Sequence, residues 1–138
     1  MMIVTSLRCL FIISGKAFYH QKSGRTTFLL TFIIDDVRRF KDSKSLIAYA
    51  GIDAPPYQSG QFEGTKRHIS KRGSRNLRKC GYEVMMALKS SKPTEDNVVY
   101  EYMLRKEAEG KNKKLVKIAG LNKFLRIYYA RVMEVHQQ

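Results

Sequence analysis

Residues 46–79, LIAYAGIDAPPYQSGQFEGTKRHISKRGSRNLRK, contain the signals around which the rest of the chain is organised. A short apolar segment ends at Gly51, and two prolines and a Ser-Gly pair follow it. A basic track then runs from Lys66 to Lys79 with seven Lys or Arg, one His and no acid. This clustering favours a surface that binds phosphate groups, with a loop hydroxyl held beside it.

A second basic segment, residues 105–126, is also predicted to bind phosphate groups. The chain has 138 residues, about the length of one domain, and a formal net charge of +14. Residues 60–92 contain nine Lys or Arg against two acids, and residues 105–126 contain eight against two. We expect the two segments to share one face that binds a polyanion. The alternative is a basic surface that is merely solvated.

Cysteine usage and hydropathy bear on the location of the protein. Cys9 and Cys80 lie far apart in the sequence, which indicates neither a disulfide framework nor a zinc site and favours a reducing, cytoplasmic location. The apolar run in residues 1–15 contains Arg8 and is shorter than the roughly 20 residues of a membrane span. We therefore predict no signal peptide, no transmembrane helix and no membrane partner.

The predicted fold is mainly α: a small helical domain in residues 28–138, with an irregular Ser-Gly loop around Ser59 and at most a short β element. Residues 1–27 show no coherent period and stay unassigned, as a degenerate arm or a strand of uncertain structure. The apolar, β-branched run at 28–37 favours a buried strand, although its length also fits the end of a helix. A short strand at 65–70 is a further expectation.

Capping signals place the helices. Asp42 can cap a helix over about 43–50 that Gly51 ends, and Ser74 can cap the next helix after a turn at Lys71–Gly73. Two further helices are expected over about 95–109 and 113–135. Spacings of three and four predict one core. Its expected members are Phe40, Leu46, Ile47, Leu77, Val84, Met85, Tyr102, Leu115, Ile118, Leu125 and Tyr129, with Val98, Val99 and Met103 on the third helix and Val132 on the last, where Asn122 interrupts the apolar stripe.

Motifs of known chemistry are scarce. The sequence has no Walker lysine loop, no GxGxxG, no HExxH and no cysteine pair. Asp35 and Asp36 are adjacent and would point to opposite faces of a strand, so no two-metal nuclease site and no metal ligands are predicted. From the residues alone, Ser59-Gly60 is more typical of a turn than of a nucleophile. His68 suits either a phosphate donor or an ordinary surface residue.

Three separated motifs carry a resemblance to a known family. They are FKDSKSLIAYAGIDAPPYQSG at 40–60, HISKRGSRNLRK at 68–79 and VVYEYMLRKEAEGKNKKLVKIAGLNKFLRIYYA at 98–130. In this order they closely resemble the C-terminal domain of the serine-bearing insertion-sequence transposases, the insertion-sequence one-ten family, over about residues 32–135. The N-terminal half of that family is a resolvase-like nuclease domain, and its members are guided by a bridge RNA.

The resemblance implies a role for individual residues. The serine of the family's Q-S-G motif is the nucleophile, which corresponds here to Ser59. The basic I-S-K-R-G-x-x-x-L-R motif, which begins here at Ile69, lies close to the nucleic acid. A serine that attacks a phosphodiester needs cations over the phosphoryl oxygens. The candidate nucleic-acid-binding residues are Lys66, Arg67, His68, Lys71, Arg72, Arg75 and Arg78, of which Arg72 and Arg78 are the expected donors to the phosphate beside Ser59.

The implied function is DNA transposition, with this chain as the DNA-binding and serine-nucleophile part of a truncated transposase. The family's four acidic metal ligands belong to the N-terminal half, so we expect no cofactor in this chain and divalent metal in the missing domain. The chain should then be inactive alone. The implied partners are DNA, a guide RNA, and a full-length transposase or a second copy of the chain.

Two alternatives belong to other classes. One is a non-catalytic, basic helical module that binds nucleic acid and derives from a transposase. The other is a pseudogene product with no selected role. The hydroxyl of Ser59 separates the first alternative from the transposase, because only catalysis requires it.

Overall fold

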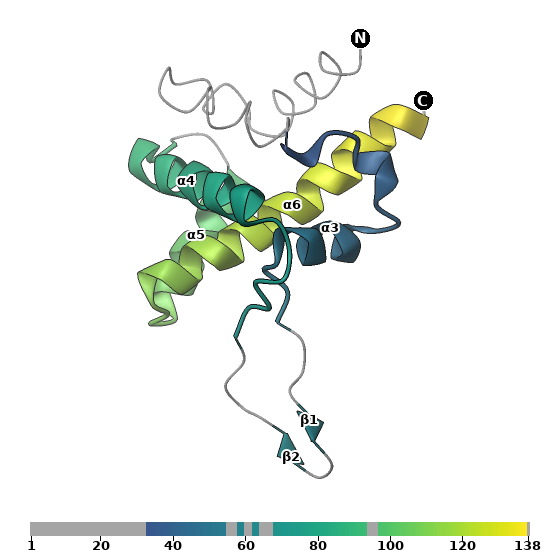
Figure 1. Ribbon diagram of the computed structural model, residues 1–138. Coiled ribbons are helices and arrows are strands. Elements are labelled where there is room, and N and C mark those ends of the chain that lie inside the picture. The colour runs from purple at the N-terminus through teal and green to yellow at the C-terminus, as the bar shows by residue number, and fades with distance from the viewer. Residues whose placement is uncertain (1–32, 55–57, 60–61, 64–67, 94–96, 138) are drawn as a thin grey trace.

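Helices dominate the part of the chain that the structure, a computed structural model, describes: residues 33–54, 58–59, 62–63, 68–93 and 97–137. The mainly α prediction is confirmed (Figure 1). In chain order the elements are η2 (Val37–Arg39), α3 (Ser43–Ala50), β1 (Gln58–Ser59), β2 (Phe62–Glu63), α4 (Arg75–Ser91), α5 (Val98–Ala108) and α6 (Lys113–Gln137).

Two helix boundaries follow the capping signals closely. The Asp42 carboxylate accepts a hydrogen bond from the backbone N–H of Ser45 at 2.7 Å, and Gly51 ends α3 with a left-handed φ of 66°. The Ser74 hydroxyl accepts from the backbone N–H of Leu77 at 3.2 Å and caps α4. Both caps were predicted from the sequence and both are confirmed.

The α6 helix is the centre of the fold, because α3, α4, α5 and η2 all contact it (Figure 1). The ring of Tyr128 on α6 is fully buried and stacks on Phe124 with a centroid separation of 6.2 Å. The Tyr129 hydroxyl donates to the backbone carbonyl of Phe40 at 3.0 Å and holds the segment before α3 against α6. The buried core comprises Ile34, Val37, Leu46, Ile47, Ala50, Ile52, Leu77, Val84, Met85, Leu88, Val99, Met103, Val116, Leu121, Phe124, Leu125, Tyr128 and Val132.

The predicted face of α6 is wrong by about one residue at its start. Leu115 was expected in the core but is 51% exposed, and the neighbouring Val116 is buried instead. On α5, Val98 is also exposed, at 56%. The buried face of α6 includes Gly120, where an added Cβ would lie 2.8 Å from Met103, so α6 turns this small residue toward α5. Phe40, Ile118 and Tyr129 are half-buried against the core.

Two predictions of β structure also need correction. The strand favoured at 28–37 is wrong at all of the described positions, 33–37. Ile33 and Ile34 are helical, which fits the alternative of a helix end, and residues 28–32 lie outside the described part of the chain. Residues 68–70 form no strand, and 65–67 lie outside the described residues. A short hairpin occurs instead around the Ser-Gly pair, where β1 and β2 pair antiparallel with Ser59 opposite Phe62.

Candidate nucleic-acid interface

Hydrogen bonds to the end of α3 hold most of the described part of the basic track. We call this region the α3–α4 junction and define it as residues 49–53 and 70–78. The backbone N–H of Ser70 donates to the carbonyl of Asp53 at 2.8 Å, and that of Lys71 donates to Gly51 at 3.0 Å. The Ser70 hydroxyl also donates to the Asp53 carboxylate. These bonds join two segments about 17 residues apart and fix the backbone that leads into α4.

Glycine permits the close approach of the two segments. A Cβ added at Gly73 would lie 2.0 Å from the carbonyl oxygen of Tyr49 and 2.6 Å from that of Ala48. Both neighbours are backbone atoms of α3, which cannot move without disturbing the helix. Gly73 was predicted as part of a turn, but the contact with α3 gives it a packing role that the sequence alone does not show.

Arg78, one cation of the basic track, takes part in the contact between α3 and α4. The Arg78 guanidinium donates to the carbonyl oxygen of Ala50 at 3.0 Å and is half-buried, so it satisfies the C-terminal end of α3. This contact joins α4 to α3 across the α3–α4 junction. Arg78 therefore has a structural role whether or not it also contacts a phosphate.

Four other cations of the track are free of ion pairs within the described residues: Lys71, Arg72, Arg75 and Lys79, all exposed. His68 is exposed as well. The first turn of α4 contains no acid, so Arg75 lies unfavourably near the positive end of the helix dipole. An anion bound there would interact favourably with both the cations and the free N–H groups of the first turn.

The hairpin that contains Ser59 lies apart from α4 (Figure 1). Figure 1 shows the hairpin of β1 and β2 beyond the helical body, away from the first turn of α4 where Arg75 lies. Ser59 lies in β1 and therefore in a short strand rather than in an irregular loop. Lys66 and Arg67 lie outside the described residues.

The carboxylates of the described residues do not suit a metal site. No group of three or more His, Cys, Asp or Glu comes together there. The Asp36 carboxylate instead accepts hydrogen bonds from the Arg38 side chain, which hold its pKa below the ordinary value, and Asp35 has a left-handed φ of 56°. Within the same residues, no helix is long and apolar enough to cross a membrane.

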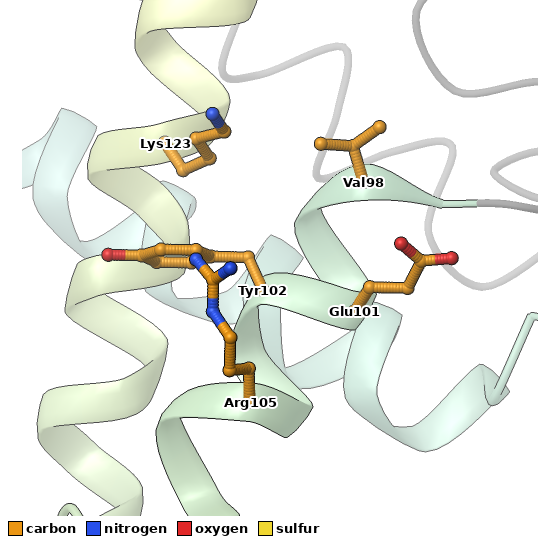
Figure 2. Close-up of a pocket in the computed structure, with 5 residues that line it drawn as sticks. All are labelled: Val98, Glu101, Tyr102, Arg105 and Lys123. Atoms are coloured by element: carbon orange, nitrogen blue, oxygen red, sulfur yellow. The ribbon is translucent and has the colours of Figure 1, made fainter. Parts of the chain in front are cut away.

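A second polar feature, the α5–α6 pocket, was missed from the sequence. Val98, Glu101, Tyr102, Arg105 and Lys123 line a cavity of about 330 Å³ (Figure 2). Lys123 reaches it from α6 and the other four residues from α5. Tyr102 had been predicted as core because its spacing fits that of Val99 and Met103. Arg105 and Lys106 follow Tyr102 by three and four positions, and this spacing could have indicated that the Tyr102 ring lies at the surface beside cations.

Two side-chain contacts hold α4 against its neighbours. Lys89 at the end of α4 forms a half-buried ion pair with Glu107 of α5 at 2.5 Å. The Lys117 ammonium of α6 lies 5.6 Å from the ring centroid of Tyr82 on α4. Lys89 and Lys117 therefore contact other side chains of the fold, although the distribution of charge predicted that both basic segments bind a polyanion. That the two basic segments share one face stays a prediction.

Comparison with known proteins tests the resemblance. Residues 23–100, more than half of the chain, match the family described as Transposase IS116/IS110/IS902 family. No curated protein matches the chain. The matched range includes Ser59, the α3–α4 junction and all of α4, and it begins within residues 1–27, which the sequence left unassigned. The chain therefore belongs to the IS116/IS110/IS902 family of transposases.

Proposed function

We propose that the chain serves DNA transposition by holding nucleic acid on the basic track and presenting Ser59 as the nucleophile. Family membership supports a transposase-related role. The α3–α4 junction is the observation that supports binding of nucleic acid. There, a hydrogen-bonded backbone holds exposed cations that have no acidic partner among the described residues. Cations on a fixed backbone bind phosphates with a smaller loss of conformational entropy than cations on a free segment.

The proposed chemistry is transfer of a phosphodiester to the serine. The Ser59 oxygen forms a bond to phosphorus and the serine proton passes to a base. The bond from phosphorus to the leaving sugar oxygen breaks, and that oxygen keeps the electron pair and takes up a proton. Cations near the phosphoryl oxygens stabilise the charge that develops on them. Because Figure 1 shows β1 apart from α4, we assign the track to holding the nucleic acid and the hairpin to reaching a different phosphate of it. The cations at that second phosphate would then come from a partner rather than from Arg72 and Arg78.

The proposal includes partners that supply what this chain does not. The carboxylates of its described residues do not fit a divalent metal site, so no metal-dependent step is assigned to them. The family's nuclease domain would bind the metal and activate the serine, in the same polypeptide or, if this is a truncated copy, from a full-length transposase. A guide RNA and a second copy of the chain are further proposed partners.

Complementation tests the nucleophile. A nuclease domain of the family and its RNA are supplied in trans, and the covalent protein–DNA adduct is measured by denaturing gel and mapped by peptide mass. We expect an adduct at Ser59 that is lost in Ser59→Ala, while the DNA affinity of that variant stays within about 0.5 kcal/mol. Ser90→Ala, at an exposed position near the end of α4, is the matched control and should keep the adduct. An adduct that survives in Ser59→Ala would overturn the assignment.

A non-catalytic binding module is the second candidate function. The position of β1 away from α4 favours it, because a nucleophile would ordinarily lie beside the groups that bind its phosphate (Figure 1). The module predicts the same binding to nucleic acid but no adduct in any complemented complex. The complementation experiment therefore separates the two functions.

A further inference from the structure

The α5–α6 pocket is a half-open, mostly charged hollow of small-ligand size. Its volume of about 330 Å³ is at the lower end of the range of about 300 to 1,000 Å³ typical of such sites. The lining combines an aromatic ring, an aliphatic side chain, two cations and one carboxylate (Figure 2). These groups can each meet a different part of one nucleotide.

The Tyr102 ring and the Arg105 guanidinium form one platform. The Arg105 guanidinium lies 5.3 Å from the ring centroid of Tyr102. Both planar groups stack on nucleobases, and such stacking tolerates different bases because every base has a π face. Neither Arg105 nor Lys123 forms an ion pair with the described residues, so both are available to a phosphate. The Lys106 ammonium also lies near this ring, 5.6 Å from its centroid, but it is paired with Glu109 at 2.8 Å.

The carboxylate of Glu101 is also unpaired within the described residues. Glu101 and Arg105 are four positions apart on α5, a spacing that ordinarily gives a salt bridge on a helix. No such bridge forms here, because the guanidinium lies toward Tyr102 instead. A free carboxylate at the edge of a pocket can accept hydrogen bonds from an amino group of a base, as acidic side chains do from cytosine.

We propose that the α5–α6 pocket holds one unpaired nucleotide of a DNA or RNA strand. The base stacks on the platform of Tyr102 and Arg105, the phosphate meets Arg105 and Lys123, and Glu101 selects an amino-bearing base over thymine or uracil. The proposal rests on the proposed binding of nucleic acid and deepens it. It assigns duplex binding to the basic track and recognition of an unpaired base to the pocket.

The test compares bulged with fully paired duplexes. The full chain is titrated with fluorescent duplexes that carry a single bulged cytosine, a single bulged thymine or uracil, or no bulge, in a DNA and in an RNA series. We expect the bulged-cytosine duplex to bind about 5- to 150-fold more tightly than the paired one, the factor that stacking of one base typically contributes. The series with the larger preference identifies the strand as DNA or RNA.

Variants connect that preference to the pocket. Tyr102→Ala should remove it and leave paired-duplex binding unchanged, whereas Tyr102→Phe should keep it because the ring remains. Tyr100→Ala is the matched control: its ring also lies near a cation, Lys89 at 5.6 Å, but does not line the pocket. Glu101→Gln should reduce the discrimination between cytosine and thymine while the preference for a bulge persists.

The outcomes separate failure of the pocket from failure of the proposed function. Paired-duplex binding with no preference for a bulge in the wild-type chain would overturn the pocket alone. So would a preference that Tyr102→Ala retains, or that Tyr100→Ala removes equally. No salt-dependent binding of any duplex would overturn both proposals. If Tyr102→Ala does not fold, the wild-type preference together with the Glu101→Gln discrimination decides the outcome.

Discussion

The α3–α4 junction and the contact between α5 and α6 are built by different means. At the junction, backbone groups hydrogen-bond to each other and Gly73 lies against backbone atoms of α3. Between α5 and α6, side chains interlock, and Gly120 faces the flexible side chain of Met103. The first arrangement fixes the position of a charged segment, whereas the second can adjust by changes of rotamer. The two regions should therefore respond very differently to the same substitution.

The largest effect is expected for Gly73→Ala. Its new Cβ would overlap backbone atoms of α3, so the junction must open, and we expect a loss of about 4 kcal/mol or more in the free energy of unfolding. Gly120→Ala is the matched control, because the methionine can move and alanine favours a helix. Its effect should stay within about 1 kcal/mol. Urea unfolding measures both variants, and equal losses would contradict the comparison.

The α6 helix gives the next effect. Leu125→Ala removes a fully buried side chain and should cost about 3 kcal/mol, within a usual range of about 2 to 5. Leu115→Ala lies on the same helix but is 51% exposed, so its change should stay within about 0.5 kcal/mol. Thermal and urea unfolding check this pair. A large loss of stability in Leu115→Ala would show that Leu115 is buried, as the sequence predicted.

The error at Leu115 has a physical reason. The α6 helix is contacted by four other elements, so apolar residues occur around much of its circumference and no single stripe marks the buried side. Both Leu115 and Val116 then fit a spacing of three and four. By contrast, α3 and the start of α4 were predictable because Asp42, Gly51 and Ser74 act within one turn of the chain.

The candidate site shows the same division between local and distant contacts. The basic track is visible in the sequence because its charges are contiguous. The hydrogen bonds between Ser70 and Asp53 and between Arg78 and Ala50 are not, because they join residues 17 and 28 positions apart. The α5–α6 pocket likewise requires the packing of α6 against α5 before Lys123 meets Tyr102 (Figure 2).

Two arginines of the first two turns of α4 sharpen the comparison. Arg78→Gln loses the hydrogen bond to Ala50 and should cost about 1 to 3 kcal/mol of stability. Arg75→Gln, at an exposed position, should leave stability within about 0.5 kcal/mol but weaken DNA binding. Unfolding curves and duplex titrations on both variants separate the two roles. Equal loss of stability would show that the distinction is wrong.

Salt dependence measures how many cations act together. If about six phosphates are neutralised, the slope of log K against log salt should be roughly −4 to −5.5, and Arg75→Gln should make it shallower by about one unit. Titration between low and physiological salt gives the slopes. A flat dependence in the wild-type chain would reject the basic track as a phosphate-binding surface.

The smallest effect is expected at the N-terminus of α3, which leads into the junction. Hydrogen bonds from the Ser45 hydroxyl and backbone N–H lower the pKa of the Asp42 carboxyl from its ordinary value of 3.8. Because the folded-state pKa is the lower one, this group stabilises the fold above about pH 4, and that contribution is lost as the pH falls through the folded pKa. Asp42→Asn keeps an oxygen for the cap but cannot titrate there. Thermal unfolding from pH 6 to 2.5 should show the wild-type chain losing more stability than Asp42→Asn only in the acid range, and parallel curves would show that the cap does not depend on the charge.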